Sequence, residues 1–230
     1  PLYPQFSSTT TASSIADWRR AAQEVGLTVP EKIVCCYAID TGFISAKTNL
    51  IAPLLESAKE AGPVRLLLSA HGLPKKVIDR GDPYQWQVEK TCEAVVAALN
   101  DKGFSGLDWQ VCYQSRVGPL EWIGPATEDA IIDAGRDGRG VVLAPIAFVS
   151  EHSETLVELD IDYRELAEKI GLPHYARVPT VGTNKEFIEG LAIIVRKALR
   201  WDDRVAHCGV GDGARCCPRQ FHVCGHGTVP

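Results

Sequence analysis

The stretch Val64-Arg65-Leu66-Leu67-Leu68-Ser69, followed by Ala70-His71-Gly72-Leu73-Pro74, decides the fold class of this chain. Its first part is almost wholly apolar and predicts a strand buried on both faces, as in parallel sheets. Four further runs have the same character, and helical patterns separate the five. The other runs are residues 32–39, 108–114, 140–148 and 175–181, and the helical stretches are 12–25, 44–61, 84–101, 126–137, 154–170 and 185–201.

Glycines mark the expected ends of several of these helices. Gly26, Gly62, Gly103 and Gly171 stand where a residue in the left-handed conformation commonly terminates a helix. Strands that alternate with helices predict an α/β fold with a parallel sheet flanked by helices. Ligands of such sheets bind outside the carboxyl ends of the strands, so the loops that follow the strands are the places to search for a site.

Composition and charge exclude several classes of protein. The chain has 230 residues, 45% hydrophobic and 23% charged, with a formal net charge of −5. This balance gives no sign of a nucleic-acid partner, no apolar run approaches the roughly 20 residues that span a bilayer, and the first residues do not form a secretory signal. We therefore expect a reducing, cytoplasmic location. Because the chain opens on Pro1-Leu2-Tyr3-Pro4 without methionine, it also reads as an excerpt of a longer protein.

Two loops after predicted strands carry candidate site residues. His71 would face the crevice, where an imidazole with a pKa of about 6.5 exchanges protons near neutrality. A structural histidine in a turn is the alternative. The loop of residues 114–125 concentrates Gly, Pro and Trp122, and an exposed tryptophan beside a crevice suits a flat aromatic ligand. A tryptophan that plugs the underside of the loop is an equally ordinary explanation.

The loop after the run 140–148 leads into a row of carboxylates. Its members are Glu151, Glu154, Glu158, Asp162 and Glu165. Their steps of 3, 4, 4 and 3 residues would place all five on one face of an α-helix. A solvated helix face explains such a row without any function. Next to His152 and at the end of a buried strand, however, the row could conduct protons or a hard divalent cation.

The eight cysteines fall into two groups. Cys35, Cys36, Cys92 and Cys112 lie in apolar segments, where a free cysteine behaves as a small hydrophobe. The other four crowd into residues 202–230, which show no helical or strand period. Such a segment must be held by a bound metal or by docking if it is ordered. Its cysteines, which predict a metal or cluster site, are Cys208, Cys216, Cys217 and Cys224.

Taken together, these motifs resemble those of ferrochelatases, in the same order along nearly the whole chain. They are Tyr3-Pro4-Gln5-Phe6-Ser7, the His71 loop with Gly81-Asp82-Pro83-Tyr84, the loop from Gln114-Ser115 to Pro125, and Pro145-Ile146-Ala147-Phe148 leading into Ser150-Glu151-His152-Ser153-Glu154-Thr155. The resemblance implies two similar α/β domains with parallel four-stranded sheets flanked by helices, and a porphyrin in the cleft between them. It begins partway into the family, so the first domain would be incomplete here.

The resemblance divides the chain into four parts. Residues 1–62 would be the remainder of the first domain, 63–183 the second domain, 184–201 a helix packing back on the first domain, and 202–230 a cysteine-rich tail. The implied activity is that of a lyase that inserts ferrous iron into protoporphyrin IX to form protohaem. Two alternatives stay open. They are a non-catalytic fragment that binds a tetrapyrrole or an iron–sulfur cluster, and a related chelatase for coproporphyrin or another metal.

The resemblance also assigns roles to residues. His71 matches the active-site histidine, as a base or a metal ligand, and Glu154 matches the glutamate that faces it across the porphyrin. The acidic row would lie on a locally widened helix and carry protons or metal. Its other metal-binding members would be Glu151, Glu158 and Asp162, and the porphyrin contacts would be Trp122, Ser115 and Tyr84.

For the tail, the resemblance implies a two-iron two-sulfur cluster, because some ferrochelatases hold one on C-terminal cysteines. Animal members place the fourth ligand just after the Tyr-Pro-Gln motif, where this chain has Ser8, so the four tail cysteines would have to suffice. A zinc site with His207, His222 or His226 is the alternative, weakened by the lack of a Cys-x-x-Cys pair. The expected partners are porphyrin and ferrous iron, with no nucleic acid. Peripheral association with the inner membrane and a homodimer stay open.

Overall fold

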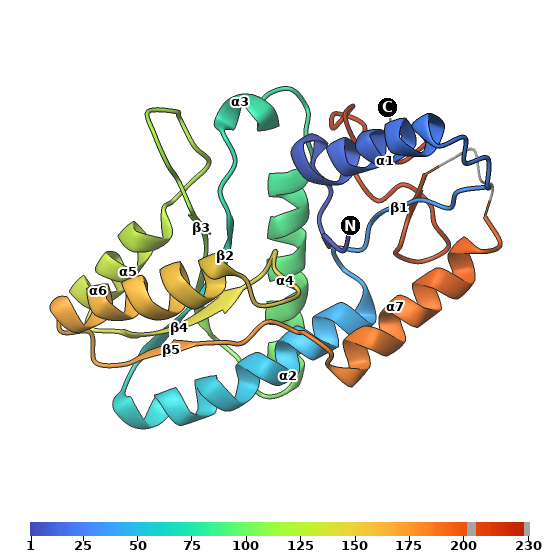
Figure 1. Ribbon diagram of the computed structural model, residues 1–230. Helices are drawn as coiled ribbons and strands as arrows, with labels where there is room; N and C mark the ends of the chain where they lie inside the picture. The colour runs from blue at the N-terminus through green and yellow to red at the C-terminus, as the bar shows by residue number, and fades with distance from the viewer. Residues whose placement is uncertain (202–205, 228–230) are drawn as a thin grey trace.

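The structure is a computed structural model that describes residues 1–201 and 206–227 (Figure 1). Helices and strands alternate along the chain, and all strand pairs in the two sheets of these residues are parallel. This confirms the predicted α/β class. Within the described residues, no helix is both long and apolar enough to cross a membrane.

The main sheet has four strands in the order β3-β2-β4-β5. They are β2 (Val64–His71), β3 (Asp108–Gln114), β4 (Gly140–Pro145) and β5 (Tyr175–Arg177). The central strand β4 is buried along its whole length, as its apolar sequence predicts. At the carboxyl edge, Ser69 pairs with Pro145 and His71 with Gln114, so three strand ends meet in one place.

Helices cover both faces of this sheet, because successive side chains of a strand point to opposite faces. Leu66 and Leu68 share a core with α2 (Thr41–Ala58) and α4 (Tyr84–Asp101). Leu67 shares the opposite core with α5 (Thr127–Arg136) and α6 (Tyr163–Lys169). Burial on both sides is the reason that the strands read as continuous apolar runs.

A second, two-stranded sheet lies beside the N-terminal helix α1 (Ser13–Glu24). β1 (Val34–Cys36) pairs in parallel with β6 (His207–Cys208), and the two strands share a small core with Phe6. Residues 202–230 show no strand period in sequence, yet they contain β6, which gains its ladder from a strand distant in sequence. Residues 202–205 and 228–230 of that tail lie outside the described residues.

Most predicted helices are present, but residues 154–170 are built differently from a single α-helix. They form a π-helix, η3 (Glu154–Asp162), that continues into α6, in line with the widened helix that the resemblance implies. The backbone hydrogen bonds of a π-helix join residues i and i+5. Such helices are rare, and they occur frequently at functional sites. Helical elements that the pattern did not predict are the π-helix η1 (Ser8–Ala12) and α3 (Lys75–Ile78). The predicted stretch 44–61 ends in a 3-10 helix, η2 (Lys59–Ala61).

The last helix, α7 (Lys185–Ala198), packs closely against α2. Glycines allow the contact, because a methyl group added at Gly42 would lie 2.8 Å from the Cα atom of Gly190. The rings of Phe43 and Phe187 meet beside it with centroids 6.0 Å apart. Since α2 also packs on the main sheet, it joins α7 to the strands that carry the site described next.

Candidate active site

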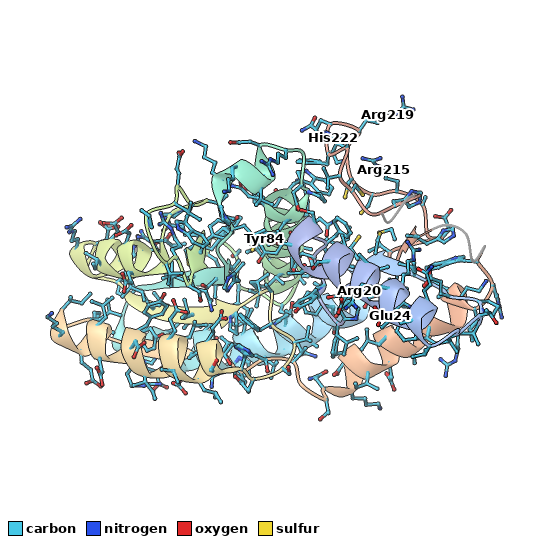
Figure 2. All side chains as sticks on the ribbon, turned by 45° about the horizontal axis from the view of Figure 1, so that its top comes forward. Arg20, Glu24, Tyr84, Arg215, Arg219 and His222 are labelled. Atoms are coloured by element: carbon cyan, nitrogen blue, oxygen red, sulfur yellow. The ribbon has the colours of Figure 1, made fainter. Side chains whose placement is uncertain are left out.

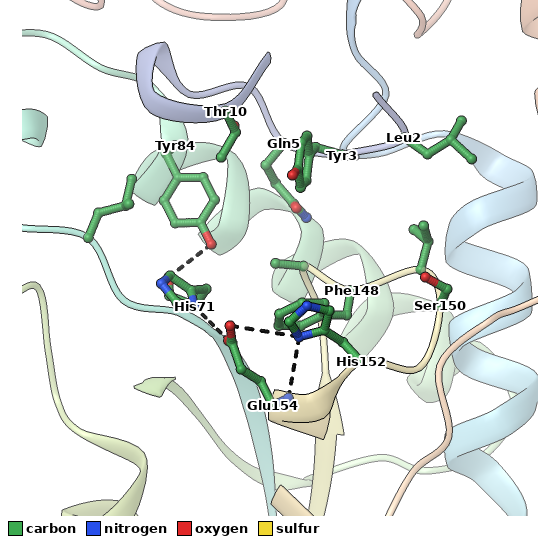
Figure 3. A pocket seen from close by; sticks show the side chains of 13 residues that line it. Leu2, Tyr3, Gln5, Thr10, His71, Tyr84, Phe148, Ser150, His152 and Glu154 are labelled. Carbon is green, nitrogen blue, oxygen red and sulfur yellow. Dashed lines mark hydrogen bonds and ion pairs between the residues drawn. The ribbon is translucent and has the colours of Figure 1, made fainter. Parts of the chain in front are cut away.

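The candidate site lies at the carboxyl edge of the four-stranded sheet, where three loops meet. His71 is the last residue of β2, Ser115 directly follows β3, and Glu154 begins η3 after the loop that follows β4. Parallel strands end on the same side of a sheet, so these distant residues converge. His71 and Glu154 line a cavity of about 410 Å³. Figure 3 shows both side chains there.

His71 and Glu154 form the central pair of the site. The Nδ1 atom of His71 lies 2.7 Å from Oε2 of Glu154, and the two side chains remain 38% and 27% exposed. The Tyr84 hydroxyl donates a hydrogen bond to the backbone carbonyl of His71 over 2.9 Å. Burial raises the pKa of Tyr84, so this hydroxyl keeps its proton. The pair is therefore held firmly and still accessible to a ligand.

Ser115 connects a second carboxylate to this pair. Its φ of 59° is one that residues other than glycine rarely adopt. In this conformation its amide donates to Oε1 of Glu158 over 2.7 Å, and its hydroxyl lies 2.9 Å from Oε2 of Glu154 and also contacts Oε2 of Glu158. The Tyr163 hydroxyl donates to Oε1 of Glu158 over 2.7 Å. An imidazole, a hydroxyl and two carboxylates thus form one connected network.

Aromatic side chains form part of the cavity wall beside the pair. Phe148 stacks on His152 with ring centroids 5.4 Å apart and an interplanar angle of 21°. Tyr3 faces the same cavity from the N-terminal segment (Figure 3). Neither Tyr3 nor Phe148 was predicted as a site residue, although each stands in one of the ordered motifs. That position was the only available signal, because their meeting depends on the tertiary fold.

The structure does not gather the whole acidic row. The Glu151 carboxylate turns to Arg177, 2.9 Å away, and to the backbone amide of Thr180, 3.0 Å away. Burial opposes the charge of Glu151, but the donors around it hold its pKa below the usual range. Asp162 is exposed at the end of η3. The expected single α-helical face is wrong, because residues 154–162 form a π-helix and Glu151 precedes it.

Trp122 supports the histidine loop and does not line this cavity. A methyl group added at Gly72, the residue after His71, would lie 3.4 Å from its ring. Trp122 also forms an isolated backbone bridge with Pro74. Its Nε1 atom is buried and finds no hydrogen-bond acceptor within the described part of the chain. The position of Trp122 therefore fits the alternative explanation, a tryptophan that packs under its loop.

A second concentration of reactive groups lies where the tail meets β1. The Sγ atom of Cys208 is 3.3 Å from that of Cys216 and 3.6 Å from that of Cys36, and the three sulfurs lie within 4.8 Å of one another. The Sγ atom of Cys217 follows, 3.9 Å from Cys216. Hydrogen bonds from neighbouring thiols lower the pKa of Cys216 and raise those of Cys36 and Cys217, as expected when adjacent thiols titrate together.

Cys36 is the member of this group that the sequence analysis missed. It is buried, as expected of a small hydrophobe, but the pairing of β1 with β6 sets it opposite Cys208. No spacing in the sequence could show this, because the ladder joins the two ends of the chain. Cys224 lies further along the tail, and a hydrogen bond with Cys217 lowers its pKa to about 7.

The tail docks on α4, the helix that begins with Tyr84. The amide nitrogen of Gln87 lies 3.0 Å from Sγ of Cys217, and its oxygen accepts from the backbone amide of Phe6 over 2.8 Å. Arg215 donates to the carbonyls of the turn that follows it. Figure 2 shows Arg215, Arg219 and His222 together on this segment.

Comparison with known proteins agrees with the motifs and the geometry. The sequence profile of the Ferrochelatase family matches residues 1–199. The chain belongs to the ferrochelatase family. Curated members named Ferrochelatase include that of Pelagibacter ubique, 49% identical over 197 residues, that of Caulobacter vibrioides, 52% identical over 199 residues, and that of Rickettsia bellii, 47% identical over 224 residues.

These alignments cover most of this chain but only part of each ferrochelatase. They include 86%, 86% and 97% of the chain, and 56%, 55% and 60% of the three relatives. The chain therefore spans little more than half the length of the relatives it matches. A solved structure assigned to cobalamin biosynthesis as a CbiX protein of Marinobacter aquaeolei is 16% identical, with a TM-score of 0.39 over 60% of this chain and 98% of that one. A TM-score this low supports no conclusion.

Proposed function

We propose that the intact protein is a lyase that inserts ferrous iron into protoporphyrin IX to form protohaem in haem biosynthesis. The observation that carries this proposal is the His71–Glu154 pair, 2.7 Å apart and open to a cavity at the carboxyl edge of the sheet. Membership of the ferrochelatase family supports it. The pair supplies the two chemical functions that the reaction needs beside a porphyrin, a base and an anionic oxygen.

Metal insertion exchanges two pyrrole protons for one divalent ion. Both N–H bonds break, the ring nitrogens bind the metal, and two protons must leave the site. With Nδ1 of His71 donating to Glu154, the free Nε2 atom of the neutral imidazole can accept one of these protons. The Glu154 carboxylate then stabilises the imidazolium, because the opposite charge is in direct contact.

The hydroxyl of Ser115 offers a route for the second proton. It contacts carboxylate oxygens of both Glu154 and Glu158, yet a hydroxyl has a single hydrogen to donate. Both contacts become hydrogen bonds only when one carboxylate is protonated and donates to the serine oxygen. Ser115, Glu154 and Glu158 therefore fit a state in which they share one proton, which passes from Glu154 towards Glu158.

Ferrous iron fits this set of donors. Oxygen and nitrogen ligands bind it with moderate strength, which suits a site that must release the metal to the porphyrin. We propose His71, Glu154 and Glu158 as its transient contacts, with the exposed Asp162 at the outer end of η3. Glu151, the remaining predicted metal ligand, forms an ion pair with Arg177, and its contribution to the site is made through that ion pair.

Flat side chains support a planar substrate in the cavity. The stacked rings of Phe148 and His152, together with Tyr3, provide aromatic surface near His71. Tyr84 and Ser115 reach the site through their hydroxyls, and Trp122 supports the loop. The first alternative is a chelatase that acts on coproporphyrin or inserts another divalent metal, and assays with competing substrates would distinguish it. The second alternative is a non-catalytic fragment that binds a tetrapyrrole.

Loss of free porphyrin fluorescence under anaerobic conditions tests the proposal. Given ferrous iron, the intact protein should consume protoporphyrin IX, and His71→Ala should lower the rate by roughly 100-fold or more, the usual contribution of a positioned base. His174→Ala removes a histidine at the start of β5, on the opposite edge of the sheet, and should leave the rate within about twofold. Porphyrin binding without turnover would establish the non-catalytic alternative instead.

We further propose that the tail cysteines hold a two-iron two-sulfur cluster. The predicted ligands Cys208, Cys216, Cys217 and Cys224 lie on one segment, and the closely spaced sulfurs of the first three fit a group that binds thiolates. Cys36 is a fifth candidate, because its sulfur lies 3.6 Å from that of Cys208 and within 4.8 Å of that of Cys216. Such a group would tie the tail to β1.

The visible spectrum of the purified protein tests the cluster. We expect a reddish-brown protein that contains iron and acid-labile sulfide in equal amounts, and loss of both in Cys208→Ser. Cys92→Ser is the matched control, because Cys92 is buried in the main core on α4. A colourless protein that contains zinc would contradict the cluster and favour the zinc alternative.

We propose that residues 63–183 form one α/β domain, that 1–62 and 184–201 belong to the other, and that 202–230 form its tail. The packing of α7 on α2 and of β6 on β1 supports grouping the two ends of the chain. We also propose that the protein is cytoplasmic and associates with the surface of the inner membrane, as a monomer or a homodimer.

A further inference from the structure

Lys47 is a buried amine outside the site just described. It lies on α2 with no exposed surface. Its Nζ atom donates to the carbonyl of Pro145 over 2.5 Å and to the carbonyl of Phe148 over 3.2 Å. Within the described residues no carboxylate lies within ion-pair distance of this nitrogen. An amine is costly to bury, so its placement calls for a reason beyond packing.

The two carbonyls belong to the segment that leads from β4 to the active site. Pro145 ends β4, and Phe148 is the residue whose ring stacks on His152. Lys47 thus hydrogen-bonds to residues 145–148 at both ends, at Pro145 and at Phe148. From there the chain passes directly to Glu154, the partner of His71.

Other hydrogen bonds also hold this segment, but they use different backbone groups from the two carbonyls that Lys47 contacts. The amide of Ile146 donates to the carbonyl of Ser69, and the carbonyl of Val149 accepts from the amide of Gly182. Without Lys47, the buried carbonyl of Pro145 and the partly buried carbonyl of Phe148 would lose their donor. Unpaired buried carbonyls are unfavourable, so the segment would shift to find water or another donor.

We propose that Lys47 is a positioning residue that holds residues 145–148 in place, and thereby sets Phe148, His152 and Glu154 at the correct distance from His71. An amine suits this task because its hydrogens reach two carbonyls that point to one place, whereas a hydroxyl could serve only one. Side chains that support a site in this way lock its geometry. Lys47 therefore acts through the loop without contacting the substrate.

Hydrogen exchange of the intact protein tests the proposal directly. Lys47→Met keeps a side chain of similar length and removes both donors. We expect amides of residues 146–156 to exchange at least about tenfold faster, while those of α5 keep the parental rate. Thr48→Val is the matched control, since Thr48 is equally buried on α2 and its hydroxyl donates to the carbonyl of Ile44 in the same helix.

Porphyrin binding provides a second readout that a purely structural lysine would not change. This readout alone rests on the proposed function. Fluorescence titration with protoporphyrin IX should show Kd raised at least about fivefold in Lys47→Met and partly restored in Lys47→Gln, whose amide keeps donors. Failure of the parental protein to bind porphyrin would contradict the proposed function and leave the exchange result as the test of Lys47.

Three outcomes would overturn the proposal. The first is a folded Lys47→Met variant with parental exchange in residues 146–156. The second is faster exchange there without any change of Kd in a protein that binds porphyrin, because the segment would then not set the site. The third is failure of both Lys47→Met and Lys47→Gln to fold while Thr48→Val folds, which would make the amine a structural requirement.

Discussion

At the scale of single residues, the free energy of burying charge explains both the site and its support. Glu151 and Arg177 are partly buried and stay ionised because they face each other. Lys47 has no such partner among residues 1–201 and 206–227, so desolvation lowers its pKa to about 7, and the more distant charge of Glu151 offsets only part of that shift. Residues 145–148 thus depend on an amine whose pKa lies close to physiological pH, so that much of it is uncharged.

The shifted pKa of Lys47 predicts how stability depends on pH. In the unfolded chain this amine holds its proton up to its ordinary pKa of 10.5, but in the folded chain only to about 7. Between these values the unfolded state binds more protons, so the contribution of Lys47 to the free energy of unfolding rises with pH, by about 1 kcal/mol per unit. Urea unfolding at pH 7.5 and 9 measures it.

The comparison with Lys47→Met isolates this effect from other titrating groups. The difference in unfolding free energy between parent and variant should change in favour of the parent as the pH rises from 7.5 to 9. A difference that stays constant across this range would show that Lys47 has an ordinary pKa in the folded protein.

At the scale of elements, the sequence was informative where burial is two-sided and local. The runs that became β2 and β4 were recognisable because both of their faces lie under helices. β6 was not, since two residues carry no period and gain a ladder only from β1. The π-helix η3 was invisible to spacing as well, because an acid every three or four residues also fits an ordinary α-helix. Only the family resemblance pointed to a widened helix.

At the scale of the whole molecule, the candidate site depends on the meeting of segments that are far apart in sequence. The family resemblance predicted that Glu154 faces His71 across the porphyrin, whereas in the structure the two side chains are in direct contact. The contribution of Cys36 to the cysteine group, the reach of Tyr3 into the cavity and the support from Lys47 could not be predicted. Each of them depends on which helix or strand packs beside which, and no local pattern encodes that.

The most direct measurement of the central claim is the rate of iron insertion in Glu154→Gln compared with that in Glu168→Gln, each in the intact protein. Both variants replace a carboxylate by an amide of the same shape, but Glu168 is exposed on α6 away from the pair. We expect a loss of roughly 100-fold or more for Glu154→Gln and a change within about twofold for Glu168→Gln. Equal rates in the two variants would contradict the assignment of the His71–Glu154 pair as the centre of the reaction.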